Sequence, residues 1–230
     1  MMNEKWLQTD DLIENPSPRV PICLCIDVSR SMSYHNGINY LKDGIKRFYQ
    51  ELKNDSAMAY SAEIAIVTFS SEVKVEENFE IVSDKSVPEF QTGGNTILGT
   101  GVLRALSLLD QRKEDYKRNG INYYQPWLLI MTDGSSYGES KTVLKEAQEA
   151  VKEREKSNKL VVIPIGVGEN ANFEELNSFS AIENRAIHVN KTSFSKFFAF
   201  ISRSVSEMSQ TDDNISKNLN LSQAVDWDDI

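Results

Sequence analysis

Three oxygen-bearing side chains stand at alternate positions in the stretch CIDVSRSMS, residues 25–33: Asp27, Ser29 and Ser31. They follow an apolar run, Val20 to Ile26, which has the length and composition of a buried strand. If the backbone leaves this strand extended, residues at i, i+2 and i+4 face the same side. One carboxylate and two hydroxyls then converge, and this all-oxygen set favours a hard cation, Mg²⁺ or Mn²⁺, over zinc.

Two further oxygen ligands stand elsewhere in the chain. Thr96 ends the loop TGGNT, residues 92–96, and offers a third hydroxyl. Asp133 follows the apolar run of LLIMTDG, residues 128–134, and offers a second carboxylate. Two carboxylates formally balance a divalent ion, and ligands that act through water leave it able to bind a further acidic group. The alternative is structural: Asp27 caps a helix, and the serines after it form turns.

The elements that must position these residues follow from hydrophobic patterning. Continuous apolar runs bounded by breakers indicate buried strands, and apolar residues at 3.6-residue spacing indicate helices that lie against a core. Strands are expected at residues 20–26, 62–69, 73–82, 128–133, 160–168 and 186–189. Helices are expected at residues 37–54, from 97 to about 118, 141–156, 173–179 and 194–208.

Strands and helices alternate along the chain, and most strands are apolar throughout rather than at every second residue. This pattern is typical of a sheet covered on both faces, and it predicts a doubly wound α/β fold. The strand at 73–82 is expected to return along the edge of the strand before it. Ligands in such folds bind outside the carboxyl ends of the strands, where Asp27 and Asp133 both lie.

Composition limits the domain organisation and the partners. The chain has 230 residues, of which 40% are hydrophobic, and this suits one α/β domain with a full core. We expect an N-terminal extension at 1–18, one domain at 19–208 and an acidic C-terminal tail at 209–230. The net charge of −9 argues against nucleic acid and anionic membranes as partners, and no apolar stretch approaches the roughly 18 residues of a membrane span.

The two cysteines favour a reducing compartment. Cys23 and Cys25 lie two residues apart on one expected strand, where they point the same way and are poorly placed to bridge each other. The N-terminal residues are polar and carry no apolar signal region. A cytoplasmic protein is the simplest interpretation.

The order and spacing of DVSRSM, GGNTILG and LLIMTDG resemble the metal-ion-dependent adhesion site (MIDAS) of the von Willebrand factor type A (vWA) domain. This resemblance implies a Rossmann-like, mostly parallel sheet with one antiparallel edge strand, the hairpin partner after SSEV. It also implies a metal site formed by Asp27, Ser29, Ser31, Thr96 and Asp133.

Two positions depart from that family pattern. Arg30 stands where the family usually has glycine. Its side chain is expected to point away from the ion, while its charge attracts acidic ligands or repels basic ones. Asn95 precedes Thr96, so Thr92 is a second candidate for the hydroxyl ligand.

A longer resemblance covers about residues 15 to 210. The stretches AEIAIVTFSSEV, GINYYQPW, VVIPIGVG and FFAFISRSVSEMS are similar to bacterial TerY-like proteins of tellurium-resistance gene clusters, and GINYYQPW is narrower to that family than the metal motif is. This resemblance implies a role in stress linked to tellurite, oxidants or phage. It also implies partners such as the protein kinases and PP2C-like phosphatases encoded near its relatives.

These observations favour a divalent-cation-dependent protein-interaction module that captures a carboxylate of a partner. One alternative is a metal-dependent phosphohydrolase, which usually needs a nucleophilic carboxylate or several acids, and a Lys or Arg for the phosphate. Ser29 stands where a second aspartate would be expected, and no lysine follows the strands, so we expect no enzyme activity. A metal-free scaffold is the third interpretation. The tail residues Asp226, Asp228 and Asp229 are candidates to occupy the open metal position in the same or a neighbouring molecule.

Overall fold

The computed structural model describes residues 17–82, 86–168, 171–190 and 194–209, without the side chains of residues 35–36, 194–195 and 204–209. The expected N-terminal extension and acidic tail lie outside the described residues except at their innermost positions. The tail aspartates Asp226, Asp228 and Asp229 are among the residues outside.

Within the described chain, six strands form one sheet in the order β3-β2-β1-β4-β5-β6. Neighbouring strands are parallel except for β2 and β3, which are antiparallel and leave β3 at the edge. The predicted doubly wound, mostly parallel sheet with one antiparallel edge strand is confirmed. The strands are β1 (Val20–Asp27), β2 (Ala62–Phe69), β3 (Val73–Ile81), β4 (Trp127–Thr132), β5 (Val161–Val167) and β6 (Ile187–Val189).

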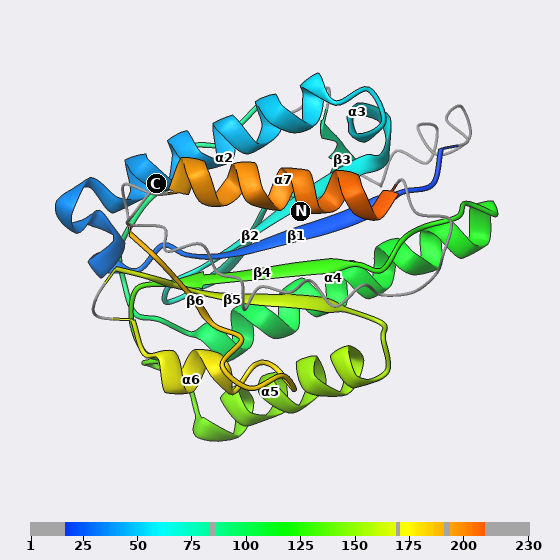
Figure 1. Ribbon diagram of the computed structural model, residues 1–230. Helices are drawn as coiled ribbons and strands as arrows, with labels where there is room; N and C mark the ends of the chain where they lie inside the picture. The colour runs from blue at the N-terminus through cyan, green and yellow to red at the C-terminus, as the bar shows by residue number, and fades with distance from the viewer. Residues whose placement is uncertain (1–16, 83–85, 169–170, 191–193, 210–230) are drawn as a thin grey trace, which may run out of the picture.

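Helices cover both faces of this sheet, as Figure 1 shows. Helices α2 and α7 lie side by side on one face, and α4 and α5 lie against each other on the other face. The helical segments are the 3₁₀ helix η1 (Arg30–Asn36) and the α-helices α2 (Gly37–Asn54), α3 (Met58–Ser61), α4 (Leu98–Asn119), α5 (Lys141–Lys156), α6 (Phe173–Asn177) and α7 (Phe194–Ser209).

Strand β1 shows why the sequence requires two helical layers. All eight of its residues are buried. Ile22 and Leu24 belong to the core under α2 and α7, whereas Cys23 and Cys25 belong to the core under α4 and α5. Successive side chains of a strand point to opposite faces, so an unbroken apolar run needs a cover on each side.

Local signals account for several element ends. Helix α5 begins after Ser140, whose hydroxyl accepts a hydrogen bond from Val143 N at 3.3 Å. Helix α4 ends at Gly120, whose left-handed backbone (φ 67°) is typical of a helix terminus. The short segments η1 and α3 are additions to the expected elements, because one or two helical turns carry too little hydrophobic periodicity to detect.

A buried charged network closes the amino end of the sheet, far from Asp27. Glu63 accepts hydrogen bonds from Arg19 Nε at 3.0 Å, Arg112 Nε at 2.7 Å and the Tyr116 hydroxyl at 2.5 Å. These four side chains are all buried. Tyr124 N, in the GINYYQPW segment, donates to Arg19 O at 2.8 Å, so this aromatic segment packs onto the domain beside the network.

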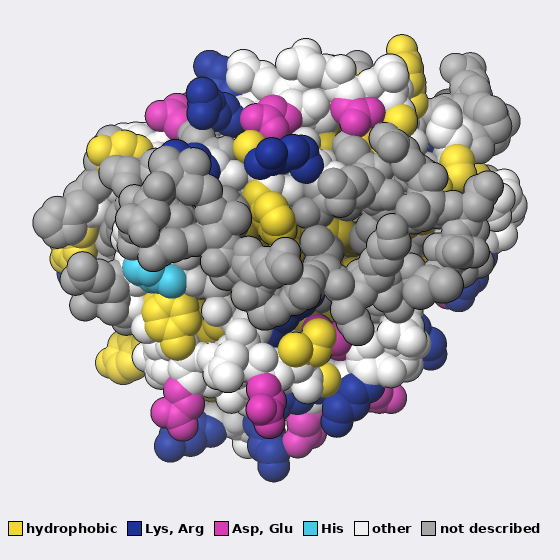
Figure 2. All heavy atoms as spheres, in the orientation of Figure 1, with side chains coloured by type: hydrophobic (Ala, Val, Ile, Leu, Met, Phe, Trp, Pro, Cys, Tyr) yellow, Lys and Arg dark blue, Asp and Glu magenta, His cyan; other side chains and the backbone are white. Residues whose placement is uncertain are grey.

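The outer surfaces of the helices are polar. Figure 2 shows basic and acidic side chains side by side over the helices at the top and bottom of that view. None of the helices in the described ranges combines the length and the apolar character needed to cross a bilayer.

Candidate metal centre

Asp27 is the last residue of β1, at the carboxyl edge of the sheet between β2 and β4. Its side chain is fully buried. Oδ1 accepts a hydrogen bond from Ser29 N at 2.7 Å, which turns the chain toward η1, and Oδ2 accepts one from the Thr132 hydroxyl at 2.5 Å. Thr132 is the last residue of β4, so this bond joins the two strand ends that carry the predicted aspartates.

The two serines connect Asp27 to Asp133. Ser29 Oγ and Ser31 Oγ lie 3.0 Å apart, and the Ser31 hydroxyl donates to Asp133 Oδ1 at 2.6 Å. A hydroxyl that donates its hydrogen to a carboxylate keeps oxygen lone pairs for another partner. Hydrogen bonds therefore link four of the five predicted ligands in sequence: Asp27, Ser29, Ser31 and Asp133.

The fifth predicted ligand, Thr96, lines the same hollow as the serines. Its loop is held by two backbone hydrogen bonds with Tyr137, at 3.0 and 2.8 Å between N and O. Thr92, the second candidate for the hydroxyl ligand, does not line this hollow. The hollow has a volume of about 340 Å³, and its lining residues are Ser29, Arg30, Ser31, Gly94, Asn95, Thr96 and Tyr137.

Two glycines allow the loops around the hollow to approach each other. Gly94 has φ 78°, and a Cβ there would lie 2.5 Å from the Ser71 hydroxyl. Gly138 has φ 92°, and a Cβ there would lie 2.6 Å from Asn95 Nδ2. The left-handed backbone and the lack of space both favour glycine at these positions.

Glu139 ties the loop after β4 to the start of α4. Its Oε1 accepts hydrogen bonds from Gly99 N and the Ser136 hydroxyl, each at 2.6 Å. Its Oε2 accepts from the backbone N and the hydroxyl of Thr100, at 2.9 and 2.8 Å. A carboxylate at this position satisfies free backbone donors and complements the positive end of the helix dipole.

A second glutamate holds the same loop from α6. Glu175 Oε1 accepts a hydrogen bond from Ser136 N at 2.6 Å. Asn172, which precedes α6, donates from Nδ2 to the Ser135 hydroxyl at 3.0 Å. The loop that follows Asp133 is therefore fixed from two sides.

Burial dominates the electrostatics of Asp27. It raises the pKa of this carboxyl from 3.8 to about 6; hydrogen bonds from Ser29 and Thr132 act against the shift, and the charge of Asp133 adds to it. No Lys or Arg in the described ranges forms an ion pair with Asp27. A cation near the two aspartates would relieve this unfavourable charge, so these residues fit a divalent metal ion.

The donor set also fits a hard cation. Two carboxylates and three hydroxyls are oxygen donors of the kind that Mg²⁺ and Mn²⁺ prefer. Among the residues whose side chains are described, no three His, Cys, Asp or Glu gather into a group that could hold a metal. His188 lies in β6 with its ring edge-on to Phe173, 5.7 Å between ring centres, and the side chain of His35 is outside the description.

Sequence reasoning missed the residues that position the ligand candidates. Thr132 had a local signal, since it directly precedes Asp133 at the end of a strand. Glu139 had none, because its bonds to α4 span about 40 positions. Arg30, expected to point away from the ion, is exposed and is among the residues that line the hollow.

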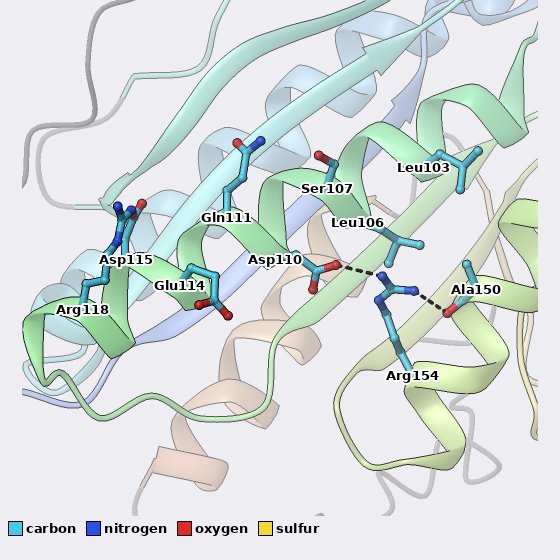
Figure 3. Close-up of a pocket in the computed structure, with 10 residues that line it drawn as sticks. All are labelled: Leu103, Leu106, Ser107, Asp110, Gln111, Glu114, Asp115, Arg118, Ala150 and Arg154. Atoms are coloured by element: carbon cyan, nitrogen blue, oxygen red, sulfur yellow. Dashed lines mark hydrogen bonds and ion pairs between the residues drawn. The ribbon is translucent and has the colours of Figure 1, made fainter.

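A larger hollow, of about 740 Å³, lies between α4 and α5 (Figure 3). Arg154 points across it, donating to Asp110 Oδ2 at 2.8 Å and to Ala150 O at 3.0 Å. The other acidic residues of its lining are paired too, Glu114 with Lys117 and Asp115 with Arg118. Each acidic residue of this lining is paired with a basic residue, so this hollow is less suited to binding a cation than the smaller one beside Ser29.

The fold is similar to several solved structures at low sequence identity. Proximal thread matrix protein 1 from the mussel byssus, in a form with a zinc-occupied MIDAS motif, is 19% identical with a TM-score of 0.57; the match covers 82% of this chain and 48% of that one. A von Willebrand factor type A protein from Catenulispora acidiphila is 17% identical with a TM-score of 0.63, covering 81% and 42%. The vWF domain of the type V pili tip protein Mfa5 from Porphyromonas gingivalis is 12% identical with a TM-score of 0.62, covering 86% and 98%.

These structural likenesses concern the fold, and the chain spans about half the length of the mussel protein. No curated protein sequence matches the chain. Residues 22–203, which make up most of the chain, match the family described as the von Willebrand factor type A domain. The order of the strands and the antiparallel edge agree with that match. The chain belongs to the von Willebrand factor type A domain family.

Proposed function

We propose that this chain is a divalent-cation-dependent protein-interaction module. Asp27, Ser29, Ser31, Thr96 and Asp133 would hold Mg²⁺ or Mn²⁺, directly or through water. The observation that carries the proposal is that the three hydroxyl candidates, Ser29, Ser31 and Thr96, line one hollow open to solvent. Hydrogen bonds join the two serines to the carboxylates of Asp27 and Asp133 behind them. A bound ion would act as a hard Lewis acid that prefers anionic oxygen. A carboxylate of a partner would therefore be its preferred further ligand.

Other residues of the chain hold the candidate ligands in place. Thr132 and Ser29 N orient the Asp27 carboxylate, and Ser31 orients that of Asp133. The paired loops at Thr96 and Tyr137 hold the far side of the hollow. A rigid set of oxygen donors reduces the loss of conformational freedom when the ion binds, which favours affinity.

Calorimetric titration with Mg²⁺, Mn²⁺ and Zn²⁺ tests the metal part of the proposal. Asp27→Ala should lose most of the affinity, whereas Glu63→Gln, at the other end of the sheet, should keep it. If Asp27→Ala binds Mg²⁺ as tightly as the unaltered chain, the assignment of the site is wrong. The zinc arm matters because the mussel protein holds zinc at its MIDAS motif.

The finer context of the proposal rests on the resemblance to TerY-like proteins. We infer a cytoplasmic bacterial protein in a stress system of the tellurium-resistance type, with a kinase or a PP2C-like phosphatase of the same system as partner. A capture experiment with purified kinase and phosphatase candidates, in Mg²⁺ and in EDTA, tests this. Retention in Mg²⁺ that is lost in EDTA and in Asp27→Ala supports the inference, and equal retention in all three samples refutes it.

A metal-dependent phosphohydrolase is the second candidate function, because Arg30 lines the hollow and could receive a phosphate. Against it, Ser29 replaces the second carboxylate that a nucleophile or a second acid would need. We expect no turnover of phosphate esters or nucleotides by the pure protein. Turnover that Asp133→Ala abolishes would overturn this expectation.

A further inference from the structure

The hollow beside the candidate metal centre has a basic residue, Arg30, in its lining. Of the seven described residues that line it, only Arg30 carries a charge. Arg30 is exposed, and none of the described acidic residues forms an ion pair with its guanidinium. Its neighbours Ser29 and Ser31 are both candidate ligands, so the arginine stands directly beside the position where a partner would meet the ion.

The charges at this site are unequal once an ion is bound. A divalent cation is formally balanced by Asp27 and Asp133, and Arg30 then remains as an unbalanced positive charge at the rim. A single carboxylate from a partner would meet the ion and leave the guanidinium without an anion. Guanidinium groups bind carboxylates through two parallel hydrogen bonds, which a lysine cannot reproduce.

We propose that the site selects a protein segment with two acidic side chains, one for the metal ion and the second for Arg30. This inference rests on the proposed function and adds a specificity determinant to it. Arg30 is a positioning residue in this scheme: it binds the partner and orients the segment, and it does not hold the ion.

Charges elsewhere on the chain restrict favourable binding of an acidic segment to the surroundings of Arg30. The net charge of −9 repels acidic partners at a distance. A second hollow, of about 230 Å³, contains Glu72, Glu76 and Glu89 together with Lys74 in its lining. Lys74 pairs with Glu72 and Lys42 pairs with Glu89, so three glutamates against two lysines leave an excess of negative charge on the side of β3. An acidic segment therefore finds a favourable charge beside Ser29 and a net unfavourable one toward β3, which restricts the direction in which it can lie across the site.

The test uses short peptides and four forms of the full chain. The peptides carry one Asp, or a second Asp placed one to four residues after the first, each matched by a version with Asn at the second position. In an extended peptide, residues two apart face the same side and lie roughly 7 Å apart. The proteins are the unaltered chain, Arg30→Gln, Arg30→Lys and the control Arg47→Gln, which removes the same charge from an exposed position of α2 outside the hollow.

Binding is measured by fluorescence polarisation in Mg²⁺ and in EDTA, with Mg²⁺ affinity measured separately by calorimetry. At the best spacing, the second Asp should tighten binding to the unaltered chain by about three- to tenfold. Arg30→Gln should remove that gain, Arg30→Lys should keep only part of it, and Arg47→Gln should keep all of it. The Mg²⁺ affinity of Arg30→Gln should not fall.

The contrary outcomes separate the two proposals. If peptides with one and two acids bind equally in Mg²⁺ at every spacing, or if Arg30→Gln keeps the gain, the role of Arg30 is refuted while the metal-dependent module stands. If no peptide binds in Mg²⁺ more tightly than in EDTA, both proposals fail. A phosphoserine peptide that binds far more tightly than every diacidic peptide would refute the assignment to two carboxylates.

Discussion

Glu139 offers a sharp test of how the site is positioned, because it contacts both loops without being a ligand candidate. Its carboxylate accepts four hydrogen bonds from Gly99, Thr100 and Ser136. Glu139→Gln keeps the length and shape of the side chain. It replaces one oxygen by an NH₂ group, which cannot accept, so two of the four donors lose their partner in either orientation of the amide.

The magnitude follows from these contacts. A buried donor left without a partner costs about 1–3 kcal/mol, and the half-buried environment of Glu139 puts each of the two at the lower end. Loss of the negative charge at the start of α4 costs about 0.3–1 kcal/mol more. We therefore expect the free energy of unfolding in EDTA to fall by about 2–4 kcal/mol.

The Mg²⁺ affinity of Glu139→Gln should fall together with its free energy of unfolding. Thr96 lies three residues before Gly99, and Tyr137 lies two residues before Glu139, so a loose junction releases the pairing that holds the hollow. An affinity loss of about tenfold for Mg²⁺ corresponds to 1.4 kcal/mol of this coupling.

Urea unfolding in EDTA and in Mg²⁺ measures the stability, and calorimetry measures the affinity. The matched control is Glu146→Gln, which removes the same charge from an exposed position of α5 and should change stability by less than about 0.5 kcal/mol. If Glu139→Gln unfolds at the same urea concentration as the unaltered chain, the positioning role is refuted. If it is destabilised but binds Mg²⁺ normally, the link between this junction and the metal site is refuted.

Three further predictions concern the pKa of Asp27, the buried network and the loop glycine. Since folding raises the pKa of Asp27 from 3.8 to about 6, the metal-free fold keeps a proton that the unfolded chain releases between these values. This difference should lower the free energy of unfolding by about 2 kcal/mol as the pH rises from 4 to 6, Mg²⁺ should offset the loss above pH 6, and unfolding curves of Asp27→Asn should lack this step. Glu63→Gln should cost about 3–5 kcal/mol of stability, because Arg19 and Arg112 lose a buried partner, yet leave Mg²⁺ binding intact roughly 20 Å away; weakened Mg²⁺ binding would show that the two ends are coupled. Gly94→Ala should weaken Mg²⁺ binding severalfold in calorimetry through its left-handed backbone and the contact with Ser71, and an unchanged affinity would show that this loop adapts freely.

The sequence by itself determined the layers of this protein and its ligand candidates. The bounds of β2, α2 and α5 agree with their hydrophobic patterns, because each element has a single period and a clear end signal. The unbroken apolar runs required two covered faces, and the antiparallel edge followed from the short return strand. Asp27, Ser29 and Ser31 could be found because they lie within five residues of one another.

Only the tertiary structure decided how those candidates are held and what surrounds them. The bond from Thr132 to Asp27 spans 105 positions, that from Ser31 to Asp133 spans 102, and those from Gly99 and Thr100 to Glu139 span about 40. Separations of this size depend on strand order and loop packing, which no local period encodes. The same holds for Arg30, whose place in the lining of the hollow is set by how η1 turns away from β1.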